Sequence, residues 1–296
     1  MSRVISPVTG KPYGMAAVCR VWRLARSGVY RHLSTSPPPI AQRRGPLGAM
    51  SDEALTTAIR GVLATSPFHG EGHRKVWARL RHAGTRTSLR RVLRLMRQNN
   101  LLAPTRVGAP RGPRSHDGTI IPDTVDAMWG TDLTTTITGE GQTAVFVAVD
   151  HCSAEGVGIH AHARATRFQA LEPIRQGVRR HFAGFAKAIA RGLALRHDHG
   201  SQYMSDHFQK ELAFLGIESS PAFVRAPEGN GCAERFIRTL KENLLWVRTF
   251  ETIEELRQAL LAFRETYNNS WLIKRHGFLT PAEYRRQHLQ PHAQAA

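Results

Sequence analysis

The order of apolar segments between residues 128 and 269 constrains the fold more than any other feature of this sequence. Two stretches with the alternating pattern of β-strands, 128–138 and 143–152, are separated by Gly139-Glu140-Gly141, and a third strand is expected at 155–163. Such short connections join antiparallel strands, so these three segments predict a meander.

Helical and strand-like segments alternate after the meander. We expect helices at 167–182, 205–216, 229–247 and 252–269, and short strands at 193–198 and 217–222. Strand–helix–strand units form parallel crossovers, so the order predicts an α/β domain with a mixed five-stranded sheet flanked by helices.

Residues 51–102 have the pattern of a separate helical module. Leu55 and Ile59 follow the helical period, Gly84 is expected to end one helix, and Thr87 or Ser88 to cap the start of the next. Two short helices around a turn, the second basic on its outer face, fit a helix-turn-helix. The alternative is a plain helical hairpin with a charged outer face.

Two segments rich in Pro, Gly and Arg, 34–48 and 103–118, are expected to be linkers. They divide the chain into four parts. These are an N-terminal helical segment with a Pro-rich linker (1–50), a basic helix-turn-helix module (51–102), a linker (103–122) and a catalytic domain (123–290).

The positive charge is concentrated near the N-terminus. Residues 1–115 contain 21 Lys and Arg against 3 Asp and Glu, whereas residues 116–296 contain 20 of each, so the net charge of +18 lies in the first part. Arg90, Arg94 and Arg97 share one helix face opposite an apolar face, and a cationic field of this kind indicates nucleic acid. The alternative, a solvated basic surface, is disfavoured by this concentration on helices.

The sequence also excludes several classes of protein. No stretch approaches the roughly 20 apolar residues that span a bilayer, and no apolar signal segment opens the chain. Cys19, Cys152 and Cys232 are widely separated, which excludes a disulfide framework and a thiolate zinc site. We therefore expect a cytoplasmic protein without a membrane partner.

Three carboxylates occupy positions from which they could converge. Asp132 lies in the first expected strand, Asp198 ends the fourth, and Glu234 begins a helix. If the first and fourth strands are neighbours, a helix packed across the sheet brings Glu234 to both aspartates. Converging carboxylates repel one another unless a cation binds, and oxygen ligands with open positions suit Mg²⁺.

The residues around these carboxylates match a known pattern. Asp132 lies in "WGTDLT", Asp198 in "RHDHGSQY" and Glu234 in "GNGCAERFIRTLKEN", with thirty-five residues between Asp198 and Glu234 and with Lys241 seven residues after Glu234. The pattern resembles the D,D(35)E signature of retroviral-type integrases and bacterial transposases. The nearest resemblance is to the insertion-sequence-three family, specifically its downstream-frame transposase. The segments "SPFHGEGHRKVWARLR", "AAVCRVWRLARSGVYRHL" and "FLTPAEYRR" extend it over most of the chain.

The resemblance implies an RNase H-like integrase core and a DDE transposase. Such an enzyme cleaves DNA strands and transfers a 3′-OH end using two Mg²⁺ ions, for which Mn²⁺ can substitute. Asp132, Asp198 and Glu234 would be both catalytic and metal-binding. Double-stranded DNA, further copies of the chain and the upstream-frame protein of the same element would be partners, in the bacterial nucleoid. The family often has Ser where this chain has His197, and Arg where it has Ala154.

Other polar residues near the triad have two interpretations. His197 and His199 lack Cys or His partners at zinc spacing, so His199 is expected to contact a substrate phosphate or to orient Asp198. Arg238 and Lys241 share a helix face with Glu234 and are expected to contact DNA, the alternative being a solvated stripe. Asp150 is expected to cap a hairpin rather than to bind metal.

Two other functions remain open from the sequence. One is a nuclease on the same fold, such as an RNase H, which the basic helical module disfavours. The other is a non-enzymatic DNA-binding remnant, which the intact triad disfavours. Strand transfer from a 3′-OH donor separates the first from a transposase, and Mg²⁺-dependent cleavage excludes the second.

Overall fold

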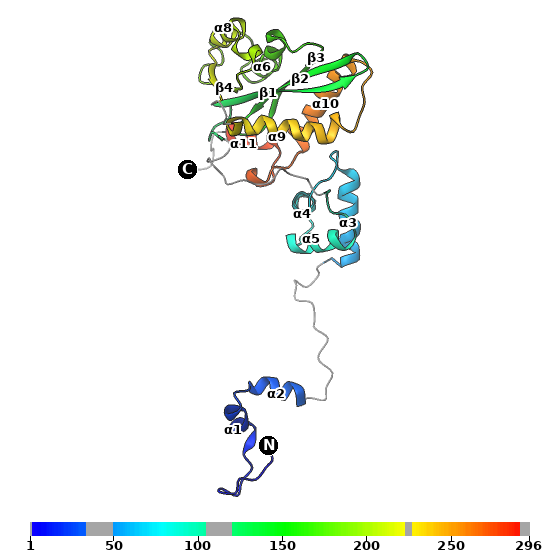
Figure 1. Ribbon diagram of the computed structural model, residues 1–296, viewed down its shortest axis with the longest axis vertical. Coiled ribbons are helices and arrows are strands. Elements are labelled where there is room, and N and C mark those ends of the chain that lie inside the picture. Colours follow the sequence, from blue (N-terminus) through cyan, green and yellow to red (C-terminus); the bar gives the residue numbers. More distant parts are fainter. Residues whose placement is uncertain (1, 34–49, 105–119, 223–226, 291–296) are drawn as a thin grey trace. The chain divides into compact units, whose positions relative to one another are not determined.

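The computed structural model describes residues 2–33, 50–104, 120–222 and 227–290 (Figure 1). The chain forms two compact units, residues 1–49 and residues 50–296. The two expected linkers, 34–48 and most of 103–118, fall outside the described residues. The first unit contains helices α1 (Gly14–Val21) and α2 (Arg26–Leu33). Within the described residues, no helix has both the length and the apolar character needed to cross a bilayer.

Residues 50–104 form a three-helix module. Its helices are α3 (Asp52–Thr65), α4 (His73–His82) and α5 (Leu89–Gln98). The Ser88 hydroxyl accepts a hydrogen bond from the Arg91 amide and so caps α5, as the sequence predicted, while Gly84 has the left-handed φ of +81° expected after a helix. Apolar side chains of all three helices form one small core. They are Leu55, Ile59, Val76, Leu80, Val92, Leu95 and Met96.

The remainder of the second unit is a five-stranded mixed sheet covered by helices on both faces (Figure 1). The strands are β1 (Met128–Thr138), β2 (Gly141–Asp150), β3 (Gly156–His162), β4 (Ala194–His197) and β5 (Glu218–Pro221). Their order is β3-β2-β1-β4-β5. The first three pair antiparallel, whereas β4 pairs parallel with β1 and β5. The predicted mixed sheet is therefore confirmed, and the first and fourth strands are neighbours, which is the condition on which the approach of the two aspartates depends.

The helices of this domain divide between the two faces. They are α6 (Arg167–His181), α7 (Ser201–Met204), α8 (Asp206–Leu215), α9 (Gly231–Leu240), α10 (Ile253–Ser270) and α11 (Pro281–Leu289). Two 3₁₀ turns, η1 (Pro227–Asn230) and η3 (Lys274–His276), and a π-helical turn, η2 (Lys241–Leu245), complete them. Sequence analysis expected one helix over 229–247, where the structure has η1, α9 and η2 in succession. It did not anticipate α7 or the helical form of α11.

Strand β2 lies inside the sheet and supplies both hydrophobic cores. Val145, Val147 and Val149 pack against α9 and α10 on one face. Phe146 and Ala148 face α6 and α8 on the other. Alternating side chains of a strand point to opposite faces, so a strand covered on both sides is apolar throughout, as the run "TAVFVAV" is.

The helical module packs against the sheet-containing part of the same unit. The ring of Phe68 meets that of Trp271 edge to face at a centroid distance of 4.8 Å. The Arg79 guanidinium donates to the Ser270 carbonyl (3.0 Å), and the His69 amide donates to the Asn243 side chain (2.8 Å). The module thus packs against the C-terminal end of α10 and against η2.

Candidate active site

Strand pairing brings Asp132, within β1, beside Asp198, which directly follows β4. The last parallel pair between β1 and β4 is Gly130 with Arg196. Asp132 and Asp198 each lie two residues beyond that pair. This register, which the sequence alone does not reveal, therefore brings both carboxylates to the carboxyl end of β4.

Glu234 reaches this edge from the helix that covers one face of the sheet. Cys232, Ala233, Phe236 and Ile237 of α9 are buried in the core formed with β2. Glu234 lies on the exposed side of the first turn. The apolar pattern of α9 thus orients the helix so that its acidic and basic residues remain accessible.

The three carboxylates influence one another electrostatically. The pKa of Asp132 is raised to about 6, mainly by burial and also by the nearby charges of Asp198 and Glu234, against the lowering effects of the Leu133 amide and of Lys241. The Leu133 amide donates to Asp132 Oδ1 at 2.8 Å. A partly buried carboxylate beside two others is a favourable place for a cation.

The loop after β4 holds Asp198 through backbone contacts. The Gly200 amide donates to Asp198 Oδ1 (2.8 Å), and His197 Nδ1 donates to the Asp198 carbonyl (2.6 Å). The other ring nitrogen of His197 accepts from the Ser219 hydroxyl on β5 (2.9 Å). His197 is fully buried, and burial lowers its pKa. His197 therefore holds the loop through these buried hydrogen bonds, whereas His199 is exposed on the same loop.

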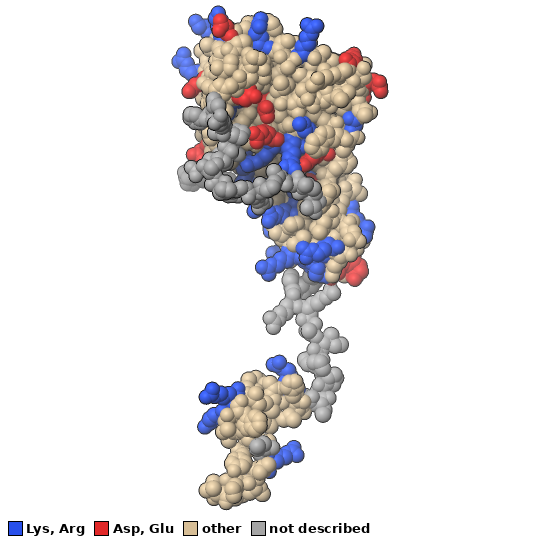
Figure 2. Space-filling model, viewed as in Figure 1, with Lys and Arg blue, Asp and Glu red and all other residues tan. Residues whose placement is uncertain are grey.

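The basic residues of α9 and of the turn that follows it lie beside the acidic edge. Lys241 begins the π-helical turn and acts on Asp132 electrostatically. Arg238 is half-exposed and pairs with Glu242 at 3.0 Å. Figure 2 shows acidic side chains with Lys and Arg next to them on this face of the domain. Anionic phosphates could contact this basic stripe next to the carboxylates.

The arginines expected to contact DNA from the helical module differ in their surroundings. Arg90, Arg94 and Arg97 of α5 are all exposed. Arg94 already pairs with Asp52 at 2.8 Å, and Arg91 binds the other oxygen of the same carboxylate at a similar distance. Arg90 and Arg97 project into solvent from a surface dense in Lys and Arg (Figure 2).

The chemistry of the triad fits a divalent cation, although the described side chains do not form a closed cage. Within the described residues, no three His, Cys, Asp or Glu side chains lie close enough to hold one ion together. The three acids nevertheless supply only oxygen donors, which Mg²⁺ prefers.

The C-terminal segment, whose role sequence analysis left unassigned, supports the start of β1. Arg285 of α11 pairs with Asp126 and lies 3.3 Å from Glu155. Asp126 accepts from the Trp129 indole at 2.9 Å. Asp150 accepts from both the amide and the hydroxyl of Ser153, which confirms its expected role as a cap for the turn.

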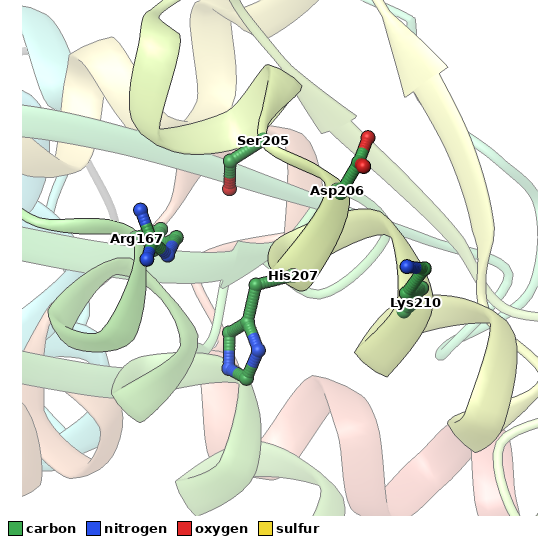
Figure 3. A pocket seen from close by; sticks show the side chains of 5 residues that line it. All are labelled: Arg167, Ser205, Asp206, His207 and Lys210. Atoms are coloured by element: carbon green, nitrogen blue, oxygen red, sulfur yellow. The ribbon is translucent and has the colours of Figure 1, made fainter.

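A pocket lies between the first turns of α6 and α8 (Figure 3). The pocket has a volume of about 300 Å³. It is lined by Arg167, Ser205, Asp206, His207 and Lys210. None of the triad residues belongs to it, and no motif singled out in the sequence points to it.

Two families of domains match parts of the chain. The HTH-like domain family matches residues 51–108, and the integrase core domain family matches residues 215–281. The second match includes Glu234 and Lys241.

Two curated proteins of Escherichia coli are similar over almost the whole chain. Transposase InsD of insertion element IS2A/D/F/H/I/K is 26% identical over 286 residues, which are 93% of this chain and 92% of that protein. The uncharacterized 48.2 kDa protein of insertion element IS2A is 25% identical over 292 residues, or 95% of this chain. The chain spans 66% of that longer relative.

Solved integrase structures are also similar at low identity. The simian T-cell lymphotropic virus intasome in complex with PP2A regulatory subunit B56 gamma gives a TM-score of 0.45 at 16% identity, covering 80% of this chain and 76% of that one. The catalytic core domain of BIV integrase gives 0.40 at 23% identity, covering 55% and 95%. The HTLV-2 integrase core in complex with magnesium gives 0.41 at 16% identity, covering 55% and 97%.

Proposed function

We infer that this chain, a homologue of the InsD transposases with an HTH-like domain ahead of an integrase core domain, is a DDE transposase that cleaves DNA strands and joins 3′-OH ends to target DNA. The observation that supports the inference is the approach of Asp198 and Glu234 to Asp132, from the end of an adjacent strand and from a covering helix. Because the charges of Asp198 and Glu234 both raise the pKa of Asp132, we assign the three carboxylates to one site.

Asp132, Asp198 and Glu234 would hold two Mg²⁺ ions, with Mn²⁺ able to substitute. When bound, such ions supply Lewis acidity on both sides of an in-line displacement at phosphorus. The amides of Leu133 and Gly200 orient the two aspartates by hydrogen bonds at 2.8 Å, so their carboxylates are preorganised by backbone rather than by flexible side chains.

The reaction needs two displacements that use the same site. In the first, water attacks a phosphodiester at the end of the element, leaving a 3′-OH and a 5′-phosphate. In the second, that 3′-OH attacks a target phosphodiester, forming one P–O bond while another breaks. Neither step requires a covalent enzyme intermediate, because the attacking oxygen comes from water in the first displacement and from the DNA 3′-OH in the second.

Basic residues around the site would bind the DNA backbone. Arg238 and His199 are exposed and Lys241 is partly buried, while Arg90, Arg94 and Arg97 lie on the exposed face of α5. Lys241 is near enough to influence Asp132, so it is the best placed of them to contact the phosphate that reacts. Phosphate contacts of this kind position DNA without selecting its sequence.

We assign a separate role to each of the four parts of the chain. Residues 51–102 anchor DNA and 123–290 catalyse, while 1–50 and 103–122 connect or extend them. The reaction joins two element ends to one target, which favours further copies of the chain on the DNA, and the upstream-frame protein of the element as a further partner. Its site of action would be the bacterial nucleoid.

Strand transfer from a pre-cleaved end tests this function. The substrate is a duplex carrying an end of the element that encodes the chain, with a free 3′-OH, mixed with target DNA and Mg²⁺. Joined products that disappear without Mg²⁺ and with Asp198→Asn support a transposase. Cleavage without joining would instead indicate a nuclease on the same fold, and no Mg²⁺-dependent product would leave only DNA binding.

A further inference from the structure

The turn before α9 lies against both strands that carry the aspartates. Asn230 occupies the N-cap position of α9, where an Asn side chain usually accepts a hydrogen bond from its own helix. Here it makes no such bond. Instead its Nδ2 donates to the Thr131 carbonyl on β1 at 2.9 Å, and the residue is only 7% exposed. The side chain therefore joins the helix of Glu234 to the residue next to Asp132.

The bonding partner of Asn230 is itself fixed. The Thr131 hydroxyl donates to the Val147 carbonyl on β2 at 2.9 Å, and Thr131 is fully buried. Glu234 follows Asn230 by four residues, so the two side chains lie one turn apart on the same face of the helix. A bond from Asn230 to β1 thus restrains the face of α9 from which Glu234 approaches Asp132.

Gly130 makes this close approach possible. A Cβ at that position would lie 2.4 Å from Asn230 Oδ1 and 2.5 Å from His151 Nε2. His151 has little freedom to move away, because its Nδ1 donates to the Ile120 carbonyl at 2.9 Å. The glycine two residues before Asp132 therefore leaves the space that Asn230 fills.

The same turn packs on the strand that ends at Asp198. A Cβ at Gly229 would lie 2.5 Å from Arg196 Nη2. Arg196 is buried on β4 and donates to the Ser220 hydroxyl (3.1 Å) and the Pro221 carbonyl (3.3 Å). Residues 229 and 230 thus contact the strands of both aspartates.

We propose that Asn230 is a positioning residue, whose bond to the Thr131 carbonyl sets the placement of Glu234 relative to Asp132 and Asp198 and so the affinity of the triad for Mg²⁺. The proposal rests on the proposed metal-dependent function of the triad. Mg²⁺ demands near-ideal octahedral geometry, so a small displacement of one carboxylate weakens its binding.

The test compares Asn230→Leu and Asn230→Ala with a matched control in the full chain. Leucine has nearly the shape of asparagine but cannot donate to Thr131. Asn268→Ala is the control, because Asn268 is also a buried asparagine that ties a helix to a strand. Its side chain accepts from the Gly156 amide (2.8 Å) and donates to the Gly156 carbonyl (3.0 Å), away from the triad.

Thermal melting and strand transfer are each measured over a range of Mg²⁺ concentrations. The transfer assay is run well below the melting temperature of each variant. We expect the half-saturating Mg²⁺ concentration of both Asn230 variants to rise about 10–100-fold, as for other residues that orient metal ligands, with unchanged DNA affinity. Asn268→Ala should lower the melting temperature and leave the Mg²⁺ dependence unchanged. Wild-type Mg²⁺ dependence in the Asn230 variants, or an equal shift in Asn268→Ala, would overturn the proposal.

Hydrogen exchange separates this proposal from the function on which it rests. If the wild-type chain shows neither a Mg²⁺-dependent melting shift nor strand transfer, the proposed function fails. The amides of the first turn of α9 still report on the tether, because losing it should speed their exchange in Asn230→Leu more than in Asn268→Ala. Equal exchange there would refute the positioning role. If Asn230→Ala does not fold, Asn230→Leu and Gly130→Ala, which displaces the same side chain, carry the test.

Discussion

Asp132 links the stability of the fold to pH, because the fold holds its carboxyl partly out of water. Its pKa is raised to about 6 from an ordinary value near 3.8, with burial as the main cause. A raised carboxyl pKa favours the protonated form in the folded state. The corresponding stability is fully present below about pH 3.8 and is lost as the pH rises through 6. At neutral pH without a cation, ionised Asp132 therefore costs on the order of 3 kcal/mol.

Replacing Asp132 with Asn should remove that cost. We expect the metal-free Asp132→Asn protein to melt at a higher temperature than wild type at pH 8, and the difference to vanish near pH 4. Buried His151 and His276, whose pKa values burial lowers to about 4, destabilise both proteins equally as the pH falls. Melting curves from pH 4 to 8 check this, and a difference that stays constant with pH would contradict it.

The triad should act as one unit in catalysis. Asp132→Asn, Asp198→Asn and Glu234→Gln should each nearly abolish strand transfer while leaving DNA binding through the module, and double variants should be little worse than single ones. Each should also reduce the stabilisation that Mg²⁺ gives the native state. Robust transfer by Asp198→Asn would refute the mechanism and return attention to His197 and His199.

At the scale of elements, periodicity predicted the sheet and most of the helices because each is long or strongly patterned. The order of segments also predicted the meander and the parallel crossovers. The order of segments could not predict features that depend on contacts between residues distant in sequence. Asn230 and Gly130 lie inside the quoted motifs, yet their meeting needs η1 to reach β1. Trp246 follows an apolar helical stretch, a pattern typical of a core residue, yet after the π-helical turn it is 69% exposed.

Lys241 tests the assignment of the exposed face of α9. Lys241→Ala should weaken DNA binding and leave the melting temperature nearly unchanged, since exposed substitutions usually alter stability by within about 0.5 kcal/mol. Lys187→Ala, an exposed lysine between α6 and β4, is the control and should leave DNA binding near the wild-type level. Loss of the fold in Lys241→Ala would show that the residue is structural.

At the scale of the whole molecule, the helical module has two effects, one through its charge and one through its packing. The helical module contributes much of the positive charge, yet it also covers Trp271 with Phe68 and binds Ser270 through Arg79. Deleting it would expose apolar surface as well as remove charge. Its role in DNA binding is therefore better measured in the full chain.

The double variant Arg90→Gln, Arg97→Gln makes that measurement. Both side chains are exposed on α5 and leave the pairs of Asp52 with Arg91 and Arg94 intact. We expect weaker DNA binding and a salt dependence of log affinity whose slope falls by about 0.9 for each lost phosphate contact. The matched variant Arg248→Gln, on the connection after η2, should change the slope little. A slope unchanged in the double variant would exclude these arginines from the phosphate contacts.

The π-helical turn at Lys241–Leu245 has a consequence for how this protein can change over evolution. A π turn contains one residue more than an α-helical turn. The directions of side chains before and after it are therefore not tied to one helical period. Glu234 lies in the helix before the turn, whereas Asn243, which holds the His69 amide of the module, lies within the turn. Single-residue insertions or deletions after Leu240 can thus shift the contact with the helical module without rotating the acidic residue into the core.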